Sequence, residues 1–182
     1  MPVNGWGFER DADGRFRFDE AVIDGNELLE LLNSTSPSET GSLLHDAFYA
    51  GVLGPGALAR ALGTAWSRSD NPVEQLPRRT WRSLFEHVGY TEGGGMVKRP
   101  SRTTPLYRGA LPDLRDGLGW TTRPEVAQRY APAQEGARLF VLDVPPGRLL
   151  AHITPDNLGA NDEDEYVVDA RGLWATIRTV ER

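Results

Sequence analysis

The chain has 182 residues, of which 39% are apolar and 25% charged, and it contains no cysteine. This composition is typical of an ordinary globular domain, and the lack of cysteine excludes disulfides, thiolate metal sites and a cysteine nucleophile. The formal net charge of −6 argues against a large nucleic-acid footprint. No apolar run is long enough for a membrane span.

The N-terminal stretch is polar and charged, without the apolar core of a signal peptide. We therefore expect a cytoplasmic protein, or one exported by a route that needs no such peptide.

The first hundred residues carry mainly helical patterns. Near residue 18, Phe16 and Phe18 alternate with charged residues and predict a short strand or an ordered arm. Apolar residues at helical spacing, with Gly, Pro and Ser between them, then predict helices over 19–32, 43–53, 57–66 and about 77–89. Three consecutive glycines in 91–101 predict a loop or hinge.

After about residue 103 the pattern changes to short apolar or β-branched runs separated by turn residues. These runs predict strands at 104–110, 117–122, 137–145, 148–154, 164–170 and 173–180, with one helix at 123–131. The order indicates an α+β fold, with a mainly helical region over 1–102 and a strand-rich half over 103–182. We expect the two to form one compact domain.

The first motif that carries chemistry is Tyr107-Arg108-Gly109, on the first of these predicted strands. An arginine on a half-buried strand needs an anionic partner, and a pyrophosphate suits the fork of its guanidinium group. The plainer interpretation is a surface arginine beside a turn glycine.

The second motif is Trp120-Thr121-Thr122, where a predicted strand runs directly into the helix at 123–131. Thr122 and Glu125 have the spacing of a capping box, with Pro124 in the first turn. Capping does not account for Thr121. A hydroxyl at a strand end can hold a neighbouring carboxylate in position.

The third motif is the acidic run Asp162-Glu163-Asp164-Glu165 before an apolar strand. Its plainer interpretation is a solvated acidic loop, and without the glycine of a calcium loop we expect no metal there. Side chains alternate along a strand, so Glu163 and Glu165 would point to the same side. Glu165, at the start of the strand, can be aimed into a cleft.

In this order, the three motifs resemble those of the ADP-ribosyltransferase family of the Arg–Ser–Glu type, the cholera-toxin-like, arginine-specific group. The resemblance covers roughly residues 103–182. It implies a helical N-terminal part followed by a split β-sandwich, with NAD+ as the substrate bound between two sheets. The family's usual Ser-Thr-Ser is replaced here by Trp120-Thr121-Thr122, which leaves open which threonine takes the place of the serine.

The resemblance also implies a catalytic set. Glu165 would stabilise the positive charge that develops on the nicotinamide ribose, and Thr121 would orient Glu165. Glu163 would engage an acceptor, which in this group is commonly an arginine side chain. We expect an enzyme that breaks the nicotinamide–ribose bond and transfers ADP-ribose to a macromolecule, such as a protein.

The expected cofactor-binding set lies in the first two motifs and the helix after them. Arg108 would hold a phosphate of NAD+, and Gly109 would let the backbone come close to it. Tyr107 and Thr122, which occupy the remaining positions of the two motifs, are also expected to bind NAD+. Tyr130 is either a platform for nicotinamide or an aromatic residue buried on the inner face of the helix.

Several alternatives remain open from the sequence. Water in place of an acceptor would make the protein an NAD+ glycohydrolase, and the same fold could serve as a non-catalytic module that binds a partner protein. An RNA-modifying relative is disfavoured by the negative net charge. The helical half could bind a target or an inhibitory, immunity-type partner, and a role as a toxin or effector would follow only by analogy with the family.

Overall fold

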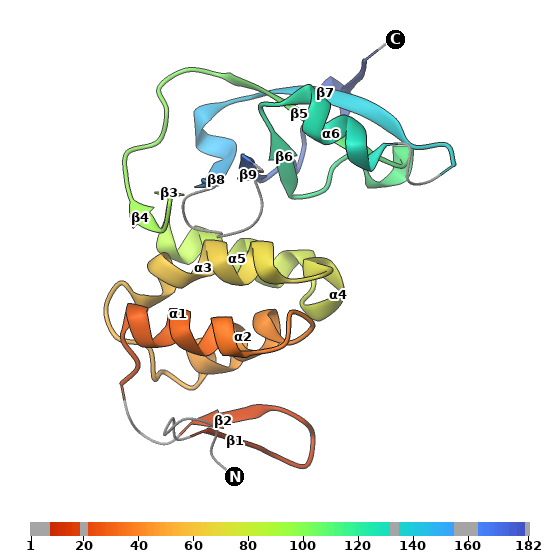
Figure 1. Ribbon diagram of the computed structural model, residues 1–182. Helices are drawn as coiled ribbons and strands as arrows, with labels where there is room; N and C mark the ends of the chain where they lie inside the picture. The colour runs from red at the N-terminus through yellow and green to blue at the C-terminus, as the bar shows by residue number, and fades with distance from the viewer. Residues whose placement is uncertain (1–7, 19–21, 132–134, 155–163, 181–182) are drawn as a thin grey trace. The chain divides into compact units, whose positions relative to one another are not determined.

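A computed structural model describes residues 8–18, 22–131, 135–154 and 164–180. The chain divides into two compact units, Met1–Leu84 and Phe85–Arg182. In Figure 1 the first unit runs from red to yellow-green and the second from green to blue. Among the helices of the described residues, none is both long enough and apolar enough to cross a membrane.

The first unit begins with a β-hairpin, β1 (Phe8–Arg10) and β2 (Phe16–Phe18), in which Phe8 pairs with Phe18. The strand expected near residue 18 is therefore confirmed. Phe16 is buried, and its backbone N–H donates to the carboxylate of Asp46 at 2.9 Å. Asp46 belongs to α2 (Thr40–Tyr49), so this bond ties the hairpin to a helix of the same unit.

The helices of the first unit are α1 (Gly25–Ser34), α2, α3 (Ala57–Arg68), α4 (Pro72–Gln75) and α5 (Arg78–Val88), the last of which continues into the second unit. Helix α1 begins later than the apolar pattern predicts because Asp24, just before it, forms a capping box with Glu27 in its first turn. The Asp24 carboxylate accepts from the N–H groups of Asn26 and Glu27, and Glu27 accepts from the N–H of Asp24.

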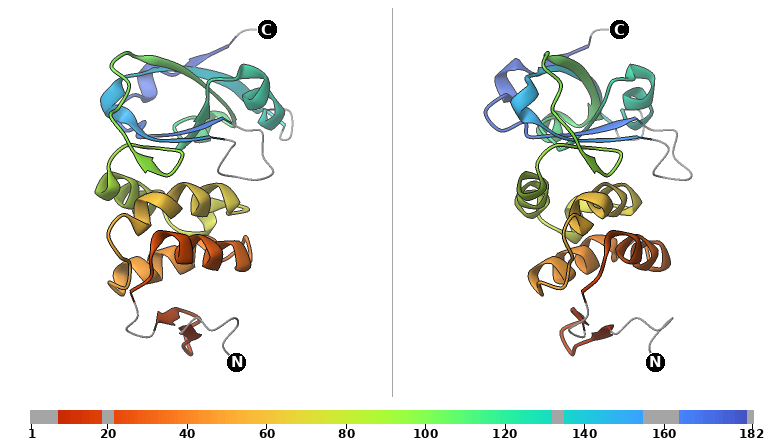
Figure 2. Two further views of the ribbon diagram at one scale, coloured as in Figure 1. Left: turned by 60° about the vertical axis from the view of Figure 1, so that its left-hand side comes forward. Right: turned by 90° about the vertical axis from the view of Figure 1, so that its left-hand side faces the viewer.

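The core of the first unit forms where α3 packs against α1 and α2 (Figure 2). Leucines at helical spacing bury one face of each helix, as the period of the sequence predicts. Trp66 and Trp81 meet edge to face with their ring centroids 5.3 Å apart. The fully buried leucines of this core are Leu28, Leu31, Leu32, Leu43, Leu44 and Leu62.

The second unit is built on an eight-stranded mixed sheet in the order β10-β7-β5-β6-β9-β8-β3-β4. The strands are β3 (Thr91–Glu92), β4 (Gly95–Met96), β5 (Thr104–Ala110), β6 (Gly119–Thr121), β7 (Arg138–Val144), β8 (Leu149–Ile153), β9 (Glu165–Val168) and β10 (Arg178–Thr179). Helix α6 (Pro124–Tyr130) packs against β5, β6 and β7. The predicted α+β class is confirmed.

The sheet is weakly joined at one place. β5 pairs with β7 along its whole length, but it pairs with β6 only through Tyr107 and Thr121. On the other side, β6 pairs with β9, and β9 pairs with β8. The join between β5 and β6 therefore separates a three-stranded part of the sheet from a five-stranded part.

Strand periodicity accounts for the core of the second unit. On β7, Phe140, Leu142 and Val144 are buried, whereas Asp143 between the last two is exposed. Leu142 and Val144 belong to a buried cluster to which both parts of the sheet contribute. Its other members are Tyr90, Leu106, Trp120, Leu149, Val168 and Ala170.

The second unit starts at Phe85. This is before residue 103, where the sequence pattern changes from helical to strand-like. Residues 91–96, predicted as part of a loop or hinge, form the short hairpin of β3 and β4, and β3 joins the sheet parallel to β8. Gly93 and Gly94, both with positive φ, make its turn. Such short strands carry too little apolar pattern to be recognised from sequence.

Candidate active site

The structure brings the three motifs onto neighbouring strands. Arg108 lies in β5, Thr121 ends β6 and Glu165 begins β9. Tyr107 pairs with Thr121, and Thr121 pairs with Glu165. Directly paired residues of antiparallel strands place their side chains side by side on one face. Thr121, which is 6% exposed, is therefore the cross-strand neighbour of Glu165.

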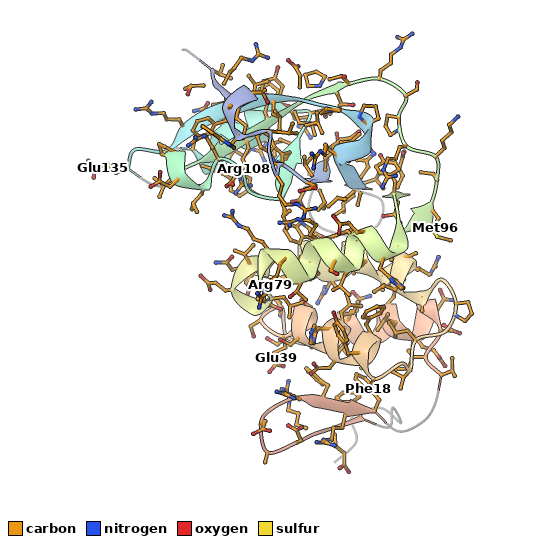
Figure 3. All side chains as sticks on the ribbon, turned by 180° about the vertical axis from the view of Figure 1, so that it is seen from behind. Phe18, Glu39, Arg79, Met96, Arg108 and Glu135 are labelled. Carbon is orange, nitrogen blue, oxygen red and sulfur yellow. The ribbon has the colours of Figure 1, made fainter. Side chains whose placement is uncertain are left out.

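Arg108 is half-buried and lies on the same face of β5 as the buried Leu106. Its Nε donates to the carbonyl of Leu114 at 3.1 Å, and its Nη1 donates to the carbonyl of Gly119 at 2.7 Å. A side chain on Gly117 would collide with its guanidinium group. Arg108, labelled in Figure 3, thus holds the loop that leads from β5 to β6.

Arg108 starts from the face of β5 opposite to Tyr107, and Glu165 lies on the face of Tyr107, yet both side chains approach Gly119. A Cβ atom on this glycine would lie 2.5 Å from Oε1 of Glu165 and 3.7 Å from Nη1 of Arg108. The guanidinium of Arg108 and the carboxylate of Glu165, far apart in the sequence, therefore both lie close to the backbone at Gly119. The absence of a side chain at Gly119 makes the room that the Glu165 carboxylate occupies.

The two threonines have different partners. Oγ1 of Thr121 accepts a hydrogen bond from the N–H of Arg123 at 3.1 Å, which closes a turn at the end of β6. Oγ1 of Thr122 donates to Oδ2 of Asp164 at 2.6 Å. The capping box predicted for Thr122 and Glu125 is wrong, since α6 has no side-chain cap and Glu125 pairs with Arg123 instead.

Helix α6 covers the face of β5 opposite Arg108. A Cβ atom on Gly109 would collide with the carbonyl oxygen of Ala127 and lie 2.8 Å from the nitrogen of Ala131. Close helix packing thus supplies a reason for this glycine that differs from the cofactor approach expected from sequence. Tyr130, the last residue of α6, is 53% exposed, so the alternative that its ring is buried is wrong. Its role in stacking on nicotinamide stays a prediction.

A second group of polar side chains, which the sequence did not reveal, surrounds Asp164. Its Oδ1 is bonded to Nε2 of His152, on β8. The imidazole of His152 stacks on Tyr166, with ring centroids 4.1 Å apart and planes 8° from parallel, and its Nδ1 lies 3.7 Å from Oε1 of Glu92. His152 lies in a strand of mostly apolar residues, and nothing next to it in the sequence indicates these partners.

Two tyrosines beside this group ionise less readily than usual. Burial, followed by the negative charges of Asp164 and Glu92, raises the pKa of Tyr166 to about 12. Burial, then Tyr166 and Glu92, raises the pKa of Tyr90 further still. Both phenols therefore stay protonated at neutral pH and can act only as hydrogen-bond partners or apolar walls.

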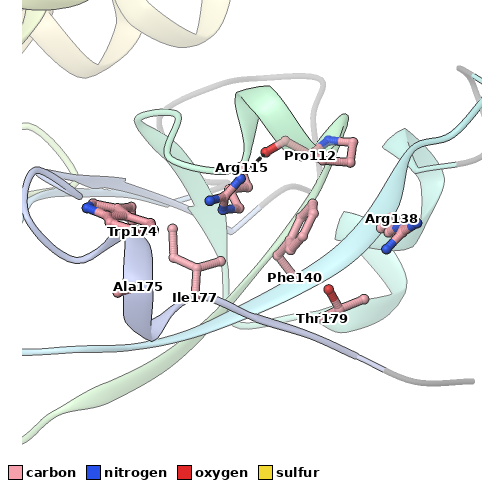
Figure 4. A pocket seen from close by; sticks show the side chains of 8 residues that line it. All are labelled: Pro112, Arg115, Arg138, Phe140, Trp174, Ala175, Ile177 and Thr179. Carbon is pink, nitrogen blue, oxygen red and sulfur yellow. Dashed lines mark hydrogen bonds between the residues drawn. The ribbon is translucent and has the colours of Figure 1, made fainter.

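A cavity of about 330 Å³ opens on the part of the sheet that contains β7 and β10 (Figure 4). Phe140 and Ile177 contribute apolar surface, Trp174 a ring that is 61% exposed, and Arg115 and Arg138 positive charge. Phe140 is the cross-strand partner of Arg108. One residue of the cavity wall is therefore a cross-strand neighbour of Arg108.

Glu163 lies outside the described residues. In the part of the chain that the structure does describe, no three His, Asp or Glu side chains are grouped in a way that could hold a metal ion. The site is thus described by Arg108, Thr121, Glu165 and the glycine between them.

No protein-family model matches the chain, and neither a curated protein nor a solved structure is similar to it.

Proposed function

We propose that this protein is an NAD+-dependent mono-ADP-ribosyltransferase that cleaves the nicotinamide–ribose bond. The observation that carries the proposal is the approach of Arg108 and Glu165 to Gly119, with Thr121 as the cross-strand partner of Glu165. The strands that carry the three motifs, β5, β6 and β9, are neighbours in the sheet. Their order in the sheet is the order in which the motifs follow one another in the sequence.

Cleavage of this bond requires an anion near the ribose more than it requires an acid. Nicotinamide leaves as a neutral molecule, while positive charge develops on the ribose in an oxocarbenium-like transition state. A fixed carboxylate that is already oriented stabilises this charge. Glu165 has the right chemistry and a defined backbone position at the start of β9.

Thr121 suits the role of orienting Glu165. Its hydroxyl oxygen accepts from the N–H of Arg123, and a hydroxyl that accepts one bond still has a hydrogen to donate. As the direct cross-strand neighbour of Glu165, it takes the place of the family's serine. Thr122, whose hydroxyl is bonded to Asp164, has a different part in our proposal.

Arg108 combines two roles in the proposal. Two of its donors hold the loop between β5 and β6. A guanidinium has five N–H donors, so the same group can also approach a phosphate of NAD+. The weak join between β5 and β6 beside it favours the finer fold, a sheet split into two parts with the dinucleotide between them.

The cavity beside Arg108 is our proposed place for the adenylate end of NAD+. Its volume of about 330 Å³ is in the range of small-ligand sites. Trp174 offers a surface on which adenine can stack, and Arg115 and Arg138 supply charge opposite to that of a phosphate.

A macromolecular acceptor completes the transferase reaction, and an arginine side chain on a protein is our first candidate. Glu163 would engage it. With water as the acceptor, the same site would be an NAD+ glycohydrolase, and a non-catalytic module would bind a partner without cleaving NAD+. Action as a toxin or effector, with an inhibitory partner, is compatible with this chemistry.

Nicotinamide release tests the proposal. The wild-type chain, incubated with NAD+ and analysed by chromatography, is expected to release nicotinamide. Glu165→Gln should lower the rate on the order of 10²- to 10³-fold without loss of thermal stability. Glu135→Gln, which changes an exposed carboxylate in a loop, is the matched control.

Full activity of Glu165→Gln would refute the role of Glu165, and no release from any variant would favour the non-catalytic module. Mass spectrometry of a lysate treated with labelled NAD+ then separates transfer from hydrolysis.

A further inference from the structure

Asp164, the residue just before Glu165, joins two strands that flank β9. Its Oδ2 accepts from Thr122, just after the end of β6, at 2.6 Å, and its Oδ1 is bonded to His152, in β8. In the sheet, β9 lies between β6 and β8. One carboxylate therefore ties the start of β9 to both of its neighbours.

His152 is a well-anchored partner for this carboxylate. It pairs across the strands with Tyr166, on which its ring stacks, and its side chain is 15% exposed. Side chains alternate along β9, so Tyr166 points to one face and Glu165 to the other. The contacts of Thr122, His152 and Asp164, which we call the β9 clasp, thus fix the backbone from which the Glu165 side chain projects.

We propose that Asp164 is a positioning residue for Glu165 and acts through the β9 clasp. This inference rests on the proposed function, and it assigns Thr122 and His152 to the support of the carboxylate rather than to contact with NAD+. The start of a short strand tends to fray unless it is held. A displacement of about 1 Å in a catalytic group can cost about 10²-fold in rate. Two hydrogen bonds to one carboxylate prevent such a displacement.

Paired variants of Thr122 test the clasp. Thr122→Val keeps the shape and removes the hydroxyl donor, whereas Thr122→Ser keeps the donor. We expect Thr122→Val and Asp164→Ala to lower kcat for nicotinamide release about 10- to 100-fold with little change in KM. Thr122→Ser should stay close to the wild type. His152→Gln should fall between them, because the glutamine amide can still donate to Asp164.

A measurement without turnover gives an independent readout. Backbone amides of Glu165–Val168 should exchange their hydrogens faster in Thr122→Val and Asp164→Ala than in the wild type, and at the wild-type rate in Thr122→Ser. Thermal unfolding shows that each variant is folded. If the wild type releases no nicotinamide, the proposed function fails, and hydrogen exchange still decides whether the clasp holds β9.

Two results would overturn the inference. A rise in KM with unchanged kcat in Thr122→Val would place Thr122 against NAD+. Equal hydrogen exchange in Thr122→Val and Thr122→Ser would show that the hydroxyl does not hold the strand.

Discussion

Gly119 lies so close to Glu165 that a Cβ atom on the glycine would be 2.5 Å from the carboxylate oxygen Oε1. The colliding atom is the far end of a flexible side chain, which can turn away at small cost in stability. A Cβ atom at position 119 would therefore move the carboxylate rather than the backbone of the sheet.

Gly119→Ala is the prediction that follows. We expect thermal stability to change by less than about 1 kcal/mol, while kcat for nicotinamide release falls on the order of 10²-fold. Gly147→Ala, at a position where a Cβ atom would meet nothing within 4 Å, is the control and should change neither. Wild-type kcat in Gly119→Ala would mean that the position of Glu165 does not limit the reaction.

Gly109→Ala should lower the stability of the folded protein. Its Cβ would collide with the backbone of α6 at Ala127 and Ala131, which cannot rotate away as a side chain can. We expect a loss of about 2 to 3 kcal/mol in the free energy of unfolding, measured by urea denaturation. Gly147→Ala again serves as the control. An unchanged free energy would show that α6 shifts freely on β5.

Asp169 makes a pH-dependent contribution to stability. Burial alone would raise its pKa, but bonds from Arg171 and Arg148, at 2.8 to 2.9 Å, outweigh burial and lower the pKa below the ordinary 3.8. A carboxyl group with a lowered pKa stabilises the folded state above that ordinary value. This stability is lost as the pH falls through 3.8 toward the lower folded-state pKa.

Asp169→Asn should therefore lose about 2 to 4 kcal/mol at pH 7, and the difference from the wild type should shrink below about pH 4. Denaturation at several pH values measures both effects. Asp143→Asn, which removes an exposed pair with Arg178, should cost under about 1 kcal/mol. The same loss from Asp169→Asn at every pH would contradict the electrostatic explanation.

Trp174→Ala tests the proposed adenylate site. A base that stacks on an aromatic side chain gains about 1 to 3 kcal/mol, so KM for NAD+ should rise roughly 10-fold or more with kcat little changed. Trp174→Phe, which keeps an aromatic face, should recover most of the affinity. If both variants bind NAD+ and AMP as the wild type does, the adenylate lies elsewhere.

Most elements could be predicted because their signals are local. The alternation of buried and exposed residues in β7 and the helical spacing of leucines in α1 are visible in a few consecutive residues. The boundaries were less predictable. Asp24 begins α1 through its own side-chain bonds, and β3 with β4 is too short to carry a pattern.

The partners of the polar side chains could not be predicted in the same way. The spacing of Thr122 and Glu125 fits a capping box, yet the hydroxyl of Thr122 bonds to Asp164, 42 positions away in the chain. His152 had no sequence signal because its partner depends on which strand lies beside β8. A local pattern contains no information about such neighbours.

The sequence by itself determined the α+β class, the approximate strands and helices, and three short motifs with an arginine, a hydroxyl and a carboxylate. Only the tertiary structure decided that Thr121 lies opposite Glu165, that Gly119 makes room for that carboxylate, and that Asp164 ties β9 to its neighbours. The physical reason is that side-chain hydrogen bonds act over about 3 Å, and the order and register of the strands determine which distant residues come within that reach.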